Sequence, residues 1–147
     1  MEAKPVVREL GLDETSLAFE AMRALRTGLA DEKAFSMRVE GARAEGYRLI
    51  GSFEEGVERA RGVAGFRTGH SLAWGFYLYV DDLSTLPEAR RRGHGGALMN
   101  WLFHEARKLG CDSLHLDSGV GTDRTDAHRL YFNQGLHITS HHFAARM

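Results

Sequence analysis

The chain changes from a strand pattern to a helix pattern at Arg90-Arg91-Arg92-Gly93-His94-Gly95-Gly96-Ala97. An apolar and aromatic run over residues 72–86 precedes this stretch, and helical periodicity follows it. Glycines let backbone N–H groups approach an oxyanion, and a helix start adds a partial positive charge. Arginines add charge-assisted hydrogen bonds. The stretch therefore predicts a diphosphate-binding loop, with a solvated basic turn as the alternative.

Length and composition indicate one soluble globular domain over residues 1–147, with 43% apolar and 27% charged residues. The net charge of −1 argues against a general nucleic-acid binder, so we expect no nucleic-acid partner. The single cysteine, Cys111, allows no internal disulfide and favours a reducing compartment. We find no apolar leader and no bilayer-spanning segment. We therefore expect a cytoplasmic protein without a membrane partner.

Hydrophobic periodicity predicts alternating strands and helices along the chain. Capping residues and glycines set the ends of the helices: Asp13 and Asp31 begin two of them, and Gly46 ends the second. The predicted strands are residues 5–10, 47–53, 58–66, 72–86, 113–117 and 136–145, with a turn at 67–71. Two later helices start near Gly95 and at Thr122 or Thr125, and end at Gly110 and Gly135. The order is strand, two helices, three strands, helix, strand, helix, strand, which is a mixed α/β fold.

Two well-known phosphate loops do not fit the stretch after Arg90. A Walker A loop needs Gly-Lys-Ser/Thr at the helix start, whereas this chain has Ala97-Leu98-Met99-Asn100. A dinucleotide fingerprint needs a glycine at position 98, and it follows a first strand near the chain start. What remains is the pattern R-x-x-G-x-G.

This pattern resembles the GCN5-related N-acetyltransferase (GNAT) superfamily, in which such a loop binds the pyrophosphate of acetyl-coenzyme A. A second motif, residues 127–136 (AHRLYFNQGL), is similar to the family's A-x-x-[FL]-Y-x-x-x-G-F. The element order also matches over nearly the whole chain. The resemblance implies a central mixed, mostly antiparallel sheet of about six strands with four helices. It also implies acetyl-coenzyme A as cosubstrate, bound by residues 90–97.

The chain departs from the family in two places. Arg124 stands where the family often has an asparagine, and the sequence reaches only Met147, just after the sixth predicted strand. The family fold commonly ends in a further strand. Part of the usual substrate wall is then absent or supplied by a second subunit in a homodimer.

The resemblance assigns roles to residues of the fourth predicted strand and the last helix. Leu83, Ser84 and Thr85 correspond to the strand whose backbone binds the pantetheine, and an N–H near Leu83 could polarise the thioester carbonyl. Tyr131 matches the tyrosine that donates to the coenzyme sulfur. Full proton transfer from tyrosine to a thiolate is uphill by about 2 kcal/mol in water, so hydrogen-bond stabilisation is at least as reasonable. The alternative for Tyr131 is an ordinary core tyrosine.

An attacking amine must lose a proton, and Asp81 is our candidate for the base, through water. Strand alternation places Asp81 with Tyr79 and Leu83 on one face and Asp82 with Val80 on the other, unless a bulge intervenes. We expect Asp82 to orient the substrate amine, with Tyr79 as another substrate contact. A solvated strand end is the alternative for both carboxylates.

We expect an acetyl-coenzyme A-dependent N-acetyltransferase that acts on a primary amine of a small molecule or protein. A non-catalytic acyl-coenzyme A sensor and a longer acyl donor are the alternatives. Arg23, Arg26 and Arg38 favour a carboxylate-bearing acceptor, whereas Asp81 and Asp82 favour a cationic amine, and the sequence does not decide between them. The chain lacks the ligand spacing of known zinc motifs, so we expect no metal.

Overall fold

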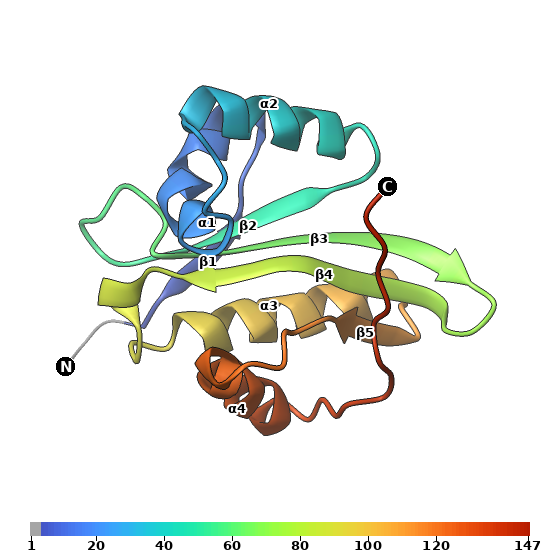
Figure 1. The fold of residues 1–147 in the computed structure, drawn as a ribbon. Helices are drawn as coiled ribbons and strands as arrows, with labels where there is room; N and C mark the ends of the chain where they lie inside the picture. The colour runs from blue at the N-terminus through green and yellow to red at the C-terminus, as the bar shows by residue number, and fades with distance from the viewer. Residues whose placement is uncertain (1–3) are drawn as a thin grey trace.

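A five-stranded sheet carries helices on both faces (Figure 1). The computed structural model describes residues 4–147. The strands are β1 (Val6–Glu9), β2 (Arg48–Phe53), β3 (Gly62–Ser71), β4 (Gly75–Thr85) and β5 (Ser113–Leu116). The helices are α1 (Phe19–Leu25), α2 (Glu32–Arg43), α3 (His94–Leu109) and α4 (Thr125–Asn133), with 3-10 turns η1 (Leu12–Ala18), η2 (Pro87–Ala89) and η3 (Thr122–Arg124). No helix in residues 4–147 is long and apolar enough to cross a membrane.

The sheet order is β1-β2-β3-β4-β5, antiparallel up to β4, with β5 parallel to β4. The parallel pair requires a crossover, and α3 supplies it. Helices α1 and α2 lie over one face of the sheet, and α3 and α4 lie on the other (Figure 1). The predicted mixed, mostly antiparallel sheet is therefore confirmed.

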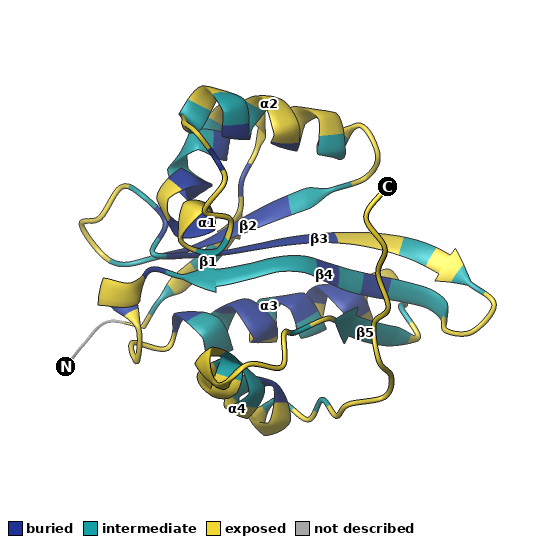
Figure 2. Ribbon diagram, viewed as in Figure 1, coloured by how far each residue is buried: buried dark blue, intermediate teal, exposed yellow. Residues whose placement is uncertain are grey.

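Strand alternation divides the buried side chains into two cores. On β2, Leu49 packs under α1 and α2, whereas its neighbour Ile50 packs against α3. The α3 core also holds Phe66, Leu78 and Leu102. Figure 2 shows that burial is deepest in the middle of the sheet and decreases toward the β3–β4 hairpin tip. Each face of the central strands is thus buried by a separate helical layer.

Several predicted boundaries in the first half are wrong, among them the start of β3, which is Gly62 and not residue 58. The helix expected from Asp13 begins as the 3-10 turn η1, capped at Gly11, and becomes α-helical only at Phe19. Residues 67–71, predicted as a turn, continue β3, because they pair with β4 from Tyr79 to Gly75. These residues are polar because this end of β3 extends past the helices and is exposed to solvent. By contrast, Asp31 caps α2 as predicted, since its side chain accepts from the Ala34 N–H at 2.8 Å.

The final predicted strand is also wrong. Residues 136–145 form no strand, so the described sheet has five strands instead of about six. Ile138 and Phe143 are exposed, and they gain no burial to offset the entropy lost on ordering. The segment does approach β5, where His142 Nδ1 lies 3.0 Å from Asp117 Oδ2. That a second subunit completes this wall stays a prediction.

Candidate active site

A β-bulge on β4 sets the directions of the two adjacent carboxylates. Gly65 pairs with Asp82 and Phe66 pairs with Val80, so Asp81 is the extra residue. Beyond the bulge, Leu83 joins the α3 core that already contains Val80. Simple alternation, which placed Leu83 with Asp81 and Asp82 with Val80, is therefore wrong. Both carboxylates instead reach partners on the α1–α2 side.

Strands β4 and β5 separate beside this bulge. Their pairing runs from Tyr77 opposite Ser113 to Val80 opposite Leu116, where β5 ends. Strand β4 continues to Thr85 along β3 alone. The Leu86 N–H donates to Arg61 O at 2.9 Å, so by alternation the main-chain groups of Leu83 and Thr85 point away from β3. Those two residues present backbone donors and acceptors to the gap, whereas Ser84 faces β3.

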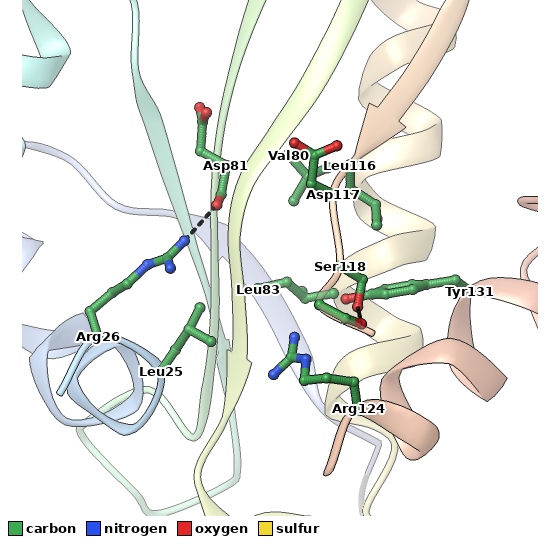
Figure 3. Close-up of a pocket in the computed structure, with 11 residues that line it drawn as sticks. Leu25, Arg26, Val80, Asp81, Leu83, Leu116, Asp117, Ser118, Arg124 and Tyr131 are labelled. Atoms are coloured by element: carbon green, nitrogen blue, oxygen red, sulfur yellow. Dashed lines mark hydrogen bonds between the residues drawn. The ribbon is translucent and has the colours of Figure 1, made fainter. Parts of the chain in front are cut away.

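A cavity of about 280 Å³ occupies this gap (Figure 3). Both helical layers contribute to its wall, so it passes from one side of the sheet to the other. Its lining residues are Leu25, Arg26, Val80, Asp81, Leu83, Leu116, Asp117, Ser118, Gly119, Arg124 and Tyr131. The structure thus brings three of the predicted site residues, Asp81, Leu83 and Tyr131, together at one cavity.

Tyr131 enters the cavity from α4, pointing toward Ser118 and Leu83 (Figure 3). The residue is 9% exposed, and burial raises the pKa of its hydroxyl. The hydroxyl forms no hydrogen bond with any other group in the described chain, while the ring contributes to the cavity wall. A neutral phenol with an unused O–H is a hydrogen-bond donor at neutral pH.

Asp81 lies on the opposite wall of the cavity. Its carboxylate accepts from Arg67 Nε at 3.0 and 3.1 Å. Burial raises its pKa above the ordinary aspartate value, and the charge of Asp82 adds to this, while Arg67 acts against it. A raised pKa makes Asp81 a better proton acceptor than an exposed carboxylate.

Asp82 is held by two donors on the α1–α2 side. Tyr47 Oη donates to its Oδ2 at 2.7 Å, and Arg26 Nε donates to its Oδ1 at 2.9 Å. Arg26 Nη2 also donates to the Asp81 carbonyl at 3.0 Å. Burial, followed by the charge of Asp82, raises the pKa of Tyr47, so its proton stays in this hydrogen bond.

Tyr79 lies outside the cavity wall, toward the hairpin. The Arg67 guanidinium stands over its ring, 5.2 Å from the centroid. Burial and the nearby Asp117 raise the pKa of Tyr79. A substrate contact from Tyr79 stays a prediction.

The predicted phosphate loop leads into the first turn of α3. Gly93 has φ +88°, a left-handed conformation that favours glycine, and it caps the helix. The first helical bond that the chain forms there runs from Ala97 N–H to Gly93 O, at 3.0 Å. No described side chain caps this turn, so the N–H groups of residues 94–96 remain for a ligand. The cradle therefore fits an anion.

The side chains of the loop divide into two groups. Arg90 and Arg91 are exposed, and Arg91 adopts φ +64°. Arg92 is engaged with Glu54, 3.1 Å from both carboxylate oxygens. Of the predicted cofactor-binding residues, His94 offers only its backbone, because its ring is buried.

The His94 ring is fixed by both of its nitrogens. Nδ1 lies 2.7 Å from Ser52 Oγ, and Nε2 lies 2.9 Å from Glu54 Oε1. A neutral ring satisfies both contacts when Ser52 donates to Nδ1 and the Nε2–H donates to Glu54. These bonds anchor the start of α3 to the end of β2.

Sequence reasoning missed several residues at the site. Tyr47 lies just before β2, and no motif marks it, while Ser118 and Gly119 belong to an irregular loop after β5. The sequence signal for Tyr47 is Gly65, because a glycine inside a strand often marks the close approach of another group. No group of three or more potential metal ligands occurs in the part of the chain that the structure describes.

Comparison with known proteins agrees with this geometry. The model of the acetyltransferase (GNAT) family matches residues 16–136. An uncharacterised N-acetyltransferase of Bacillus subtilis (strain 168), YhdJ, is 32% identical over 133 residues, which are 89% of this chain and 90% of that protein.

Two solved structures share the fold at low sequence identity. The aminoglycoside N-acetyltransferase AAC(6')-Iy, in complex with CoA, has a TM-score of 0.83 at 16% identity, covering 100% of this chain and 97% of that one. Glucosamine-6-phosphate N-acetyltransferase from Arabidopsis thaliana has a TM-score of 0.76 at 17% identity, covering 98% and 99%. The family match, the relative and the shared fold lead to one conclusion: this chain belongs to the acetyltransferase (GNAT) family.

Proposed function

We propose that the protein is an N-acetyltransferase that moves an acetyl group from acetyl-coenzyme A to a primary amine. The observation that carries this proposal is the Tyr131 hydroxyl, which has no partner among residues 4–147 and lines the gap between β4 and β5. A structural core tyrosine at this position would normally satisfy its hydroxyl with a protein partner. The AAC(6')-Iy structure, which is a complex with CoA, supports the choice of cosubstrate.

The residues fit a direct transfer. The amine nitrogen forms a bond to the thioester carbon, and the carbon–sulfur bond breaks. The backbone N–H of Leu83 donates to the carbonyl oxygen, and such a donor is worth about 3 kcal/mol. Asp81 accepts the amine proton through water, and Tyr131 donates a hydrogen bond to the leaving thiolate.

The loop before α3 fits the diphosphate of the cosubstrate. The N–H groups of residues 94–96 and the exposed Arg90 and Arg91 supply donors and positive charge. Arg92 can join them only by exchanging its contact with Glu54. The side chain of His94 takes no part, since its ring is used internally.

Thiol release in the presence of acetyl-coenzyme A and a panel of amines tests the proposal. We expect acceptor-dependent thiol release by the wild type and a much lower rate for Tyr131→Phe. Tight coenzyme A binding in calorimetry without acceptor-dependent release would instead indicate an acyl-coenzyme A sensor. Replacing the acetyl donor with propionyl- or butyryl-coenzyme A measures how long an acyl chain the gap accepts.

A further inference from the structure

A second cavity, of about 200 Å³, lies between α1, α2 and the sheet. Its wall combines apolar and polar side chains. The apolar residues are Met22, Leu29, Phe35, Val39 and Ala42. The polar residues are Arg26, Arg38, Tyr47 and Asp82, of which all but Tyr47 carry a charge. A ligand that fills this cavity therefore has an apolar body and a charged end.

The polar residues of the second cavity offer both signs of charge. Asp82 is a carboxylate whose side chain is only 16% exposed, held by Arg26 and Tyr47. Arg38, one helix away, forms no hydrogen bond or ion pair with any described residue. A partly buried carboxylate attracts an ammonium group, and an unpaired guanidinium attracts a carboxylate.

Arg26 connects the second cavity to the first. It lines both of them, and it bonds to the Asp82 carboxylate and the Asp81 carbonyl. Asp81 is the base in the proposed transfer. A group that replaces Arg26 at Asp82 therefore lies next to Asp81, which lines the first cavity together with Leu83 and Tyr131.

We propose that the acceptor is a zwitterionic α-amino acid with an apolar side chain. Its ammonium pairs with Asp82, its carboxylate with Arg26 and Arg38, and its side chain enters the apolar part of the second cavity. The inference rests on the proposed function and names the acceptor class of the same site.

A zwitterion fits this site better than an ion of either sign. It opens the Arg26–Asp82 pair and gives each partner a new counter-ion, so the largely buried Asp82 carboxylate keeps a cation beside it. A simple amine would pair with Asp82 and leave the half-exposed Arg26 with solvent alone, whereas a simple acid would pair with Arg26 and leave the Asp82 carboxylate with Tyr47 alone. In the sequence, the arginines of the first two helices favour an acidic acceptor, and the carboxylates of β4 favour a cationic one. A zwitterion binds both sets of residues at once.

Matched acceptors test the carboxylate requirement directly. Thiol release is measured with leucine, with leucinamide and with isoamylamine, which share the same apolar body. We expect kcat/KM for leucine to exceed that for the other two by about tenfold or more, because each lacks the charge that pairs with the arginines. Equal rates for all three would overturn the proposal.

A matched pair of variants locates the effect. Arg38→Ala should raise KM for leucine about tenfold and leave KM for isoamylamine unchanged. Arg23→Ala is the control, since Arg23 is an α1 arginine that stands over the Phe19 ring and lines neither cavity. We expect Arg23→Ala to behave as the wild type with both acceptors. An equal response of the two variants would also contradict the assignment.

The size of the apolar part is tested by filling it. Ala42→Leu should lower kcat/KM for leucine and phenylalanine relative to alanine, because the added side chain occupies the cavity. Calorimetry with coenzyme A separates the two proposals. Coenzyme A binding together with thiol release that is as efficient for amines without a carboxylate as for leucine would defeat the acceptor assignment alone, whereas no binding and no release would defeat the proposed function.

Discussion

The Tyr47 hydroxyl reaches Asp82 by passing over the bare backbone of Gly65, the residue opposite Asp82 in the sheet. A Cβ added at Gly65 would lie 1.6 Å from Tyr47 Oη. The bulge at Asp81 turns Asp82 to this side, so one glycine and one extra residue together create the contact. The glycine and the bulge both belong to the sheet, and together they position the Asp82 carboxylate in the wall of the second cavity.

Gly65→Ala should therefore destabilise the protein by about 2–3 kcal/mol, since Tyr47 must move and lose a hydrogen bond to a charged acceptor. Urea unfolding measures this change. A double-mutant cycle with Tyr47→Phe is the control. In the Tyr47→Phe background the same glycine substitution should cost about 1–2 kcal/mol less, because that hydrogen bond is already gone. Simple additivity would contradict the role given to Gly65.

The parts of the site that the sequence predicted are those encoded locally. The loop before α3 and the motif around Tyr131 are contiguous stretches, and local residues fix both a helix start and a helix face. The sequence could not place Asp81 and Asp82, because their directions depend on pairing across β3. One extra residue inverts the alternation from there to the end of the strand.

Removing the Tyr131 hydroxyl should lower the catalytic rate and leave the stability of the fold almost unchanged. Tyr131→Phe should lower kcat about 10- to 100-fold, the value of one hydrogen bond to a developing thiolate. The free energy of unfolding should change by less than about 0.5 kcal/mol, since the hydroxyl has no partner within residues 4–147. Tyr77→Phe, which lies near the hairpin tip, is the matched control, and steady-state thiol release is the measurement. An equal loss of rate in both variants would speak against a special role for Tyr131.

Asp81 should contribute a pH dependence of opposite sign to that of a carboxylate whose pKa falls on folding, because burial outweighs its ion pair with Arg67. Burial raises its folded-state pKa, so the folded state binds more protons than the unfolded state above the ordinary carboxyl pKa of about 3.9. The free energy of unfolding then falls as pH rises from that value through the folded pKa. Asp81→Asn should abolish this fall and lower kcat by about 10²–10⁴.

Urea unfolding between about pH 3.5 and 7 measures the difference in stability for Asp81→Asn. Asp126→Asn serves as the control, because Asp126 is an exposed carboxylate in the first turn of α4. Stability curves of Asp81→Asn and the wild type that run parallel over this range would contradict the assigned cause.

The helix order and the Asp31 cap were predictable for the same local reason, whereas the last strand was not. Residues 136–145 have a strand-like pattern, yet a strand forms only where a neighbouring edge accepts it. Strand β5 pairs over only four residues, and the segment approaches it through the contact of His142 with Asp117. Pattern alone contains no information about the length of that edge.

Two neighbouring glycines at the start of α3 distinguish anion binding from packing. A Cβ on Gly95 would meet Leu130 Cδ2 at 2.9 Å, whereas a Cβ on Gly96 has no described neighbour closer than 3.9 Å. Gly96→Ala should therefore stabilise the helix by about 0.5–1 kcal/mol, and Gly95→Ala should be neutral or destabilising. Both methyl groups lie beside N–H groups that we assign to the diphosphate, so both variants should bind coenzyme A more weakly in calorimetry. A Gly96→Ala protein that gains stability and keeps wild-type affinity would show that the diphosphate binds elsewhere, because no loss of structure could then explain the result.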